Sequence, residues 1–127
     1  MKEEARKLLE KGKRAAHAAE TLLRGGDYEF AAGRAYYAML HAAQALLREQ
    51  DLRYRKHASV HAAFGEHFAK PGRLDPKYHR WLLDAFDDRI RGDYDADVSF
   101  DRETVIKRLD QAREFLQEAG RLMEKTQ

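Results

Sequence analysis

Apolar residues recur at steps of three and four along most of the chain, the spacing of one face of a helix. The first stripe covers residues 5–23 and ends at Gly25-Gly26, because glycine readily adopts the backbone conformation that closes a helix. A second stripe runs from Asp27, a capping residue type, to about Arg48. Alanines fill much of the rest of this second helix. It is therefore expected to be packed on several sides, either as the central helix or against another subunit.

The middle of the chain predicts one short helix. Residues 53–56 have the composition of a loop, and the apolar residues Val60, Phe64 and Phe68 follow at helical spacing. This helix is expected to stop near residues 70–72, where proline and glycine both break the pattern.

Two longer helices are predicted in the last part of the chain. Asp75-Pro76 is a helix start, with aspartate as the cap and proline in the first turn, and the helix is expected to end near Gly92. Asp101 can cap the last helix, whose apolar stripe continues to Met123.

No segment alternates apolar and polar residues as a strand would. The prediction is an all-α protein, an up-and-down antiparallel helical bundle with four main helices and one short helix, because short loops favour antiparallel neighbours. A chain of 127 residues has the common size of one domain, so residues 1–127 are expected to form a single helical domain.

The composition narrows the class of protein further. The chain has no cysteine, and its formal charge of +2 is the remainder of 24 basic and 22 acidic side chains, so the overall charge does not indicate a nucleic-acid binder. No apolar run approaches the roughly 20 residues that cross a bilayer, and the first residues lack the apolar centre of a signal peptide. A cytoplasmic protein is expected.

Metal and cofactor motifs are weak. His57 and His61 lie one helical turn apart, but no third ligand is evident from spacing. Residues 93–97 are similar to the start of a calcium loop, yet Val98 and Thr104 stand where such a loop needs glycine and glutamate. No P-loop, nucleophile elbow or dinucleotide fingerprint occurs. The sequence predicts no metal and no cofactor.

Several segments, in order along the chain, resemble the HEPN domain family. They are residues 34–47, Lys56-His57, residues 64–68, residues 89–95 and residues 112–116. The resemblance implies a helical bundle that is usually dimeric and is found alone or beside a small nucleotidyltransferase. A homodimer or higher homo-oligomer, with a nucleotidyltransferase as a possible partner, is therefore expected.

The resemblance also implies a place for a ribonuclease motif. Many members of the family are metal-independent ribonucleases that use Arg-x(4 to 6)-His, the arginine for the phosphate charge and the histidine for proton transfer. Near the end of the penultimate helix this chain has Arg89, and Tyr94 stands where a four-residue spacer would put histidine. Three matches occur elsewhere in the chain, where about two are expected by chance, so they carry no signal. They are Arg34 with His41, Arg55 with His61, and Arg73 with His79.

The candidate site that remains is a nucleotide-binding one. It consists of Arg89, Arg91, Asp93 and Tyr94, with Tyr37 and His41 added on the resemblance. Two guanidinium groups can hold phosphate oxygens, and a tyrosine can stack on a base. The competing interpretation is that Arg89 pairs with a neighbouring aspartate, either Asp87, Asp88 or Asp93, and that Tyr94 only packs.

Three functions remain open from the sequence. The first is a non-catalytic HEPN protein that binds a nucleotide or RNA, as partner of a nucleotidyltransferase in a toxin-antitoxin-like module. The second is a metal-independent ribonuclease toxin with a degenerate motif. The third is a pure oligomeric interaction module. No catalytic residue is predicted, since the expected histidine is absent.

Overall fold

The computed structural model describes residues 1–125, and every regular element in that range is helical. The elements are α1 (Glu3–Arg24), α2 (Tyr28–Glu49), α3 (His57–Phe64), a π-helical turn η1 (Gly65–Ala69), α4 (Lys77–Tyr94) and α5 (Arg102–Lys125). The predicted all-α class is confirmed. Within these residues no helix has the length and apolar character needed to cross a membrane.

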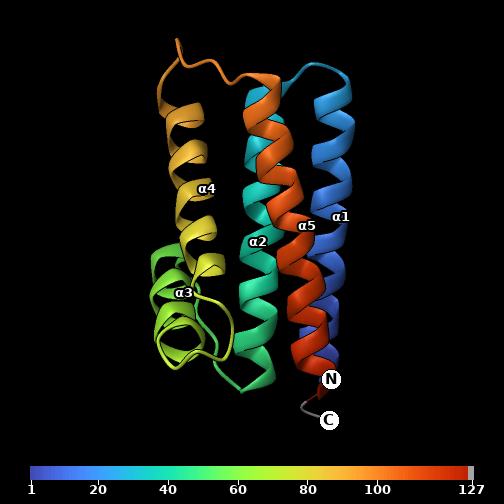
Figure 1. The fold of residues 1–127 in the computed structure, drawn as a ribbon, viewed down its shortest axis with the longest axis vertical. Coiled ribbons are helices and arrows are strands. Elements are labelled where there is room, and N and C mark those ends of the chain that lie inside the picture. The colour runs from blue at the N-terminus through green and yellow to red at the C-terminus, as the bar shows by residue number, and fades with distance from the viewer. Residues whose placement is uncertain (126–127) are drawn as a thin grey trace.

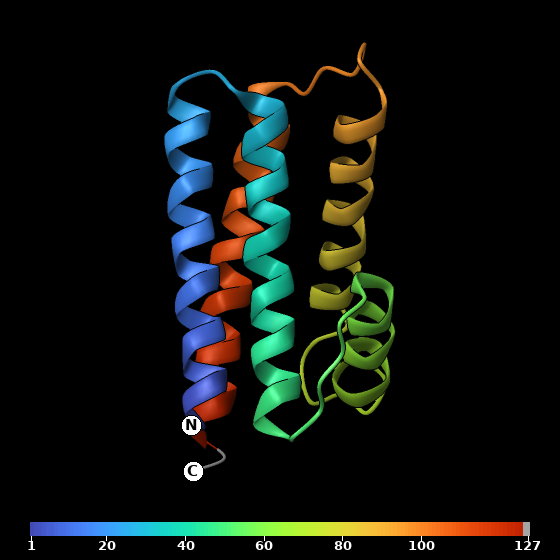
Figure 2. The ribbon, with the colours of Figure 1, turned by 180° about the vertical axis from the view of Figure 1, so that it is seen from behind.

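The four long helices alternate in direction. In Figure 1, α1 and α4 run upward, and α2 and α5 run downward, so that α1 begins and α5 ends at the lower end of the bundle. Figure 2 shows α2 in front of α5, with α1 on one side and α3 and α4 on the other. The short helix α3 lies beside the lower half of α4. The up-and-down arrangement follows from the short connections that the sequence predicted.

The core is built around α2. This helix packs against α1, α3, α4 and α5, and twelve of its residues are buried. Seven of the twelve are alanine, so neighbouring helices approach closely on several sides. At one such approach a Cβ built on Gly12 of α1 would lie only 3.1 Å from the backbone oxygen of Ala38. The expectation of a central second helix is confirmed.

The ends of the helices agree only in part with those predicted from the sequence. Asp101 caps as expected, because its carboxylate accepts the backbone N–H of Thr104 at 2.7 Å. Helix α4 begins one residue later than expected, with Pro76 at the capping position, and the carboxylate of Asp75 accepts the backbone N–H of Lys77 at 2.9 Å. Asp27 makes no side-chain cap hydrogen bond, so that cap was wrong. Helix α4 continues two residues beyond the expected end at Gly92, to Tyr94.

The short helix differs from its prediction in its second half. Residues Gly65–Ala69 form a π-helical turn, in which the backbone N–H of Lys70 bonds to the carbonyl of Gly65 at 2.8 Å. The imidazole of His79 on α4 packs against Gly65, where an added Cβ would lie 2.8 Å from the ring. Apolar spacing does not distinguish this wider turn from an α-helical one, since both bury Phe64 and Phe68.

Candidate nucleotide-binding cleft

A small cleft lies between α2 and α4. Its volume is about 210 Å³. The residues that line it, called here the α2–α4 cleft, are Glu29, Phe30, Gly33, Arg34 and Tyr37 from α2 and Arg89, Gly92 and Asp93 from α4. Two successive turns of α2 and the last turns of α4 thus form its walls.

Two arginines flank one tyrosine in this cleft. The guanidinium carbon of Arg34 lies 5.3 Å from the centre of the Tyr37 ring, and that of Arg89 lies 5.0 Å from the same ring. Arg34 and Tyr37 are three residues apart on α2, so helical geometry places them side by side. The aromatic ring therefore holds two cations near each other at the cleft.

The two guanidinium groups make at most one weak ion pair with a carboxylate among the described residues. Arg89 has a loose ion pair with Asp93, at 3.5 Å, and its side chain is 25% exposed. Arg34 is exposed and has no ion pair within residues 1–125. An incoming anion can therefore bind these groups without breaking a buried salt bridge.

His41 lies one turn beyond Tyr37 on α2. The two rings are 6.0 Å apart, and Nδ1 of His41 hydrogen-bonds Oε1 of Gln44 at 2.8 Å. Burial is the main cause that lowers the pKa of His41, and the nearby charges of Lys11 and Arg34 lower it further. Cations of α1 and α2 therefore lie close together along this face.

A buried tyrosine next to the cleft binds two histidines of α3. The hydroxyl of Tyr36 lies 2.8 Å from Nε2 of His61 and 3.2 Å from Nδ1 of His57. Burial lowers the pKa of His61 to about 4, and it raises the pKa of Tyr36 above its ordinary value. The pKa of His57 is also lowered, first by burial and then by the charge of Arg89.

The structure brings together only part of the predicted site. Tyr37, Arg89 and Asp93 line the cleft, and His41 lies beside it. Arg91 lies elsewhere, because it pairs with the buried carboxylate of Asp88 at 2.6 Å.

Tyr94 also lies outside the cleft lining, with 83% of its surface exposed at the end of α4. Arg89 and Arg91 therefore do not form a fork on one phosphate. The competing interpretation holds in part, because Arg89 pairs loosely with Asp93 at 3.5 Å, whereas the buried aspartate, Asp88, binds Arg91.

Sequence reasoning missed Arg34, Tyr36 and the role of the two histidines. Arg34 was set aside because its spacing to His41 is common by chance. The pair His57 and His61 was considered only for a metal, and their one-turn spacing is explained by the shared hydroxyl of Tyr36. The signal available was a tyrosine pair one helical turn before a histidine, and it does not reveal which helix packs opposite. Among residues 1–125 no group of three or more metal-ligating side chains comes together.

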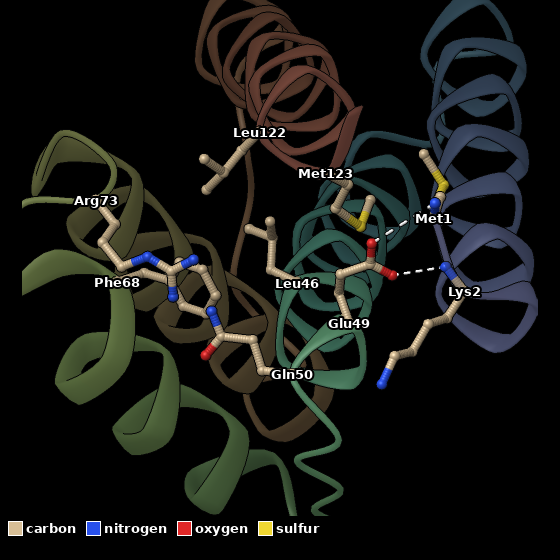
Figure 3. A pocket seen from close by; sticks show the side chains of 9 residues that line it. All are labelled: Met1, Lys2, Leu46, Glu49, Gln50, Phe68, Arg73, Leu122 and Met123. Atoms are coloured by element: carbon tan, nitrogen blue, oxygen red, sulfur yellow. Dashed lines mark hydrogen bonds and ion pairs between the residues drawn. The ribbon is translucent and has the colours of Figure 1, made fainter. Parts of the chain in front are cut away.

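A larger cavity, of about 430 Å³, lies at the end of the bundle where α1 begins and α5 ends. Figure 3 shows Phe68 and Arg73 on one side of it and Glu49 with Met1 and Lys2 on the other. Glu49 is already bound by the terminal amine of Met1 at 3.8 Å and by the backbone N–H of Lys2 at 2.7 Å. Its lining is mostly apolar and its carboxylate, Glu49, is already bound, so this cavity is a poorer phosphate site than the α2–α4 cleft.

The chain is similar in sequence to a known domain family and to several proteins of archaea and bacteria. The sequence model of the HEPN domain matches residues 5–124. A protein of Methanocaldococcus jannaschii named "Putative toxin MJ0142" is 32% identical over 115 residues, which cover 91% of this chain and 78% of that protein. A second protein of that organism, "Putative toxin MJ0605", is 34% identical over 81% of this chain and 77% of its own length. A "UPF0332 protein" of Thermotoga maritima is 33% identical, covering 84% of this chain and 80% of the relative.

Proposed function

The chain belongs to the HEPN domain family, and from this premise we propose that it binds RNA through the α2–α4 cleft and acts in a toxin-like role. The toxin-like part is supported by the names of two relatives that cover most of the chain. The binding part is supported by the cleft itself. The single observation that supports RNA binding is a pair of arginines without strong ion pairs, Arg34 and Arg89, which lie next to Tyr37 in the cleft.

The arginines supply the phosphate contacts in this proposal. A guanidinium group donates two parallel hydrogen bonds to phosphate oxygens, and charge-assisted bonds of this kind are roughly twice as strong as neutral ones. Asp93 competes for Arg89, but the two groups are 3.5 Å apart and the carboxylate of Asp93 is half exposed, so their ion pair is weak. A phosphate carries more charge and can replace it.

Aromatic side chains in the same cleft can stack on a nucleobase of the RNA. Phe30 lines the cleft and is 62% exposed, an unusual position for a large apolar ring. Base stacking on an aromatic ring contributes about 1–3 kcal/mol per base. Gly33 leaves open space between these groups, since a Cβ added there would meet nothing within 4 Å.

Affinity for labelled single-stranded RNA of about 12 nucleotides, measured by fluorescence anisotropy, tests the proposal. Arg89→Ala and Arg34→Ala should each weaken binding about 10- to 100-fold, the loss of one charge-assisted contact. Arg80→Ala is the matched control, because Arg80 is exposed on α4 and lines no part of the cleft. Equal affinity of all four proteins would contradict the proposal.

Two further proposals, on self-association and on a protein partner, rest on membership of the family and not on the geometry of the cleft. We expect a homodimer or higher homo-oligomer, and a small nucleotidyltransferase as the second component of the module. Sedimentation of the purified protein at several concentrations tests the first expectation. Co-purification with a nucleotidyltransferase encoded beside it tests the second.

RNA cleavage is a second candidate function, and one observation favours it. Cleavage without a metal needs a cation for the phosphate and a group that accepts a proton. Arg89 supplies the cation, and an imidazole, His57, lies in the same aromatic cluster.

A further inference from the structure

The larger cavity, of about 430 Å³, is separate from the α2–α4 cleft. Helix α2 lines the cleft with residues between 29 and 37 and lines the cavity with residues between 46 and 50, so the two lie towards opposite ends of this helix. Ligand sites are typically hollows of about 300–1,000 Å³, lined mainly by apolar side chains with a few polar groups that fix the ligand's orientation. The cavity has a volume in this range, and the proposed RNA contacts leave it unused.

One part of the cavity wall is apolar and is built from three elements. Leu46 of α2, Phe68 of η1 and Met123 of α5 line it, and each is at most 2% exposed. Leu122, which is half-buried, extends the same wall (Figure 3). These side chains offer water no hydrogen bond, so the apolar part of a ligand would replace water there favourably.

An arginine without an ion pair lies over one ring of this wall. The guanidinium carbon of Arg73 is 4.5 Å from the centre of the Phe68 ring, and Arg73 has no ion pair within residues 1–125. An arginine that stacks on an aromatic face keeps its N–H donors available, because these lie in the plane of the guanidinium group. Arg73 can therefore donate two parallel hydrogen bonds to a carboxylate.

The turn before α4 gives this arginine a defined position. Pro71 and Gly72 follow η1, and Gly72 has a φ of +75°, a conformation that favours glycine. The reversal brings the backbone N–H of Arg73 to the carbonyl of Phe68, at 2.9 Å, next to the ring on which the arginine lies. Phe68 itself stacks on Phe64 in the core, with 5.6 Å between the ring centres.

The carboxylate of the cavity lies on the side away from Arg73. Figure 3 shows Glu49 opposite Arg73, with Gln50, a neutral hydrogen-bonding side chain, on the arginine's side. Glu49 is 12% exposed and accepts the backbone N–H of Lys2 at 2.7 Å. The ammonium group of Lys2 pairs with Asp51, at 2.6 Å. Among the residues that line the cavity, Arg73 is thus the charged side chain left to bind a ligand.

We propose that this cavity binds a small organic anion in which an apolar chain carries one carboxylate, such as a medium-chain fatty acid. The carboxylate binds Arg73, and the chain lies against Leu46, Phe68 and Leu122. An apolar wall alone would accept any apolar molecule, whereas one guanidinium beside it selects a ligand with a single negative charge at the end of its apolar part. Nucleic acid fits less well, because its repeated phosphates need several cations.

Isothermal titration calorimetry with three probes tests the two parts of the ligand separately. Octanoate has both the chain and the carboxylate, octanol lacks the charge, and acetate lacks the chain. Octanoate should bind about 10- to 100-fold more tightly than either of the others, because it alone uses both Arg73 and the apolar wall. Equal binding of octanoate and octanol would overturn the proposal, as would no saturable binding of octanoate at roughly 1 mM.

A charge-removing variant connects the binding to this cavity. Arg73→Gln should weaken octanoate binding at least about 10-fold and leave octanol binding unchanged, and it should fold normally because Arg73 is exposed. Arg80→Gln, an exposed arginine of α4 outside the cavity lining, is the matched control and should bind octanoate like the wild type. So should Arg89→Ala, since the site does not depend on RNA binding. Equal octanoate affinity of Arg73→Gln and the wild type would overturn the proposal.

The methionines report where the ligand lies. Met1 and Met123 line the cavity, whereas Met39 is fully buried elsewhere in the core. In NMR of the protein labelled with carbon-13 at the methionine methyl groups, octanoate should shift the signals of Met1 and Met123 and leave that of Met39 in place. A titration that saturates without shifting Met123 would place octanoate outside the cavity and overturn the proposal.

Discussion

The carboxylate of Asp88 lies almost fully buried between α4 and α5, where it binds two arginines. Its two oxygens are 2.6 Å from Arg91 and 2.5 Å from Nε of Arg108. Arg108 is 15% exposed, so it depends on this carboxylate for its charge to be neutralised. The ion pair of Asp88 with Arg108 joins α4 to α5.

Asp88→Asn should therefore destabilise the fold strongly. Losing the carboxylate leaves the guanidinium of Arg108 half-buried without a counter-charge, which costs about 3 kcal/mol of unfolding free energy. Urea denaturation followed by circular dichroism measures the change. Asp84→Asn, on the same helix and without an ion pair within residues 1–125, is the control and should change stability by less than about 0.5 kcal/mol.

Replacing Tyr94 is expected to have little effect on either stability or RNA binding. With 83% of its surface exposed and no place in the cleft lining, Tyr94→Ala should leave RNA affinity within about twofold and stability unchanged. A loss of binding as large as that of Arg89→Ala would show that the end of α4 belongs to the site.

The residue scale also shows how far the sequence could predict the site. Spacing on one helix correctly placed Tyr37 with His41, and Arg89 with Asp93, because residues three or four apart share a face. It could not decide between Arg89 and Arg91, since their directions depend on where α5 brings Arg108. Nor could it associate His57 with Tyr36, because that contact depends on how α3 packs against α2.

At the scale of the helices, α1, α2 and α5 meet at Gly12. A Cβ there would lie 2.7 Å from Cδ2 of Leu116 and 3.1 Å from the backbone oxygen of Ala38. The leucine can move, but the backbone oxygen of a central helix cannot. Small residues at this crossing therefore set the distance between three helices.

Gly12→Ala should lower stability by about 1 kcal/mol, because overpacking exceeds the gain in helix propensity. Gly120→Ala on α5 should instead raise stability by up to about 1 kcal/mol, since its Cβ would make an ordinary 3.5 Å contact with Leu9. Thermal unfolding of both variants measures the difference. Two changes of the same sign would contradict the assigned packing.

Most of the fold was predictable at this scale. The apolar stripes and the glycine and proline breaks located all five helical regions, because each helix buries one face. The π-helical turn was not predictable, since it depends on the contact of His79 with Gly65. The extension of α4 to Tyr94 was likewise invisible, because glycine at position 92 does not end a helix that packs against Phe100.

At the scale of the whole molecule, buried neutral histidines link stability to pH. The pKa of His61 is lowered from 6.5 to about 4, and the pKa values of His41 and His57 are lowered in the same direction. Below pH 6.5 the unfolded chain binds more protons at these sites than the folded chain does, so acid favours unfolding.

Stability should therefore fall as the pH decreases from 6.5 to 4, with His61 alone contributing about 3 kcal/mol of the loss. Urea midpoints across this range measure it. His61→Gln should have a smaller slope of stability against pH, whatever its stability at neutral pH. An unchanged slope would contradict the assignment of the loss to this histidine.

NMR of the nitrogen-15-labelled protein titrated with single-stranded RNA tests whether RNA binds between α2 and α4. We expect the largest shifts at Arg34, Tyr37 and Arg89, with smaller shifts at His41 and His57. Shifts confined to the cavity beside Glu49 and Arg73, or no shifts at saturating RNA, would contradict this expectation.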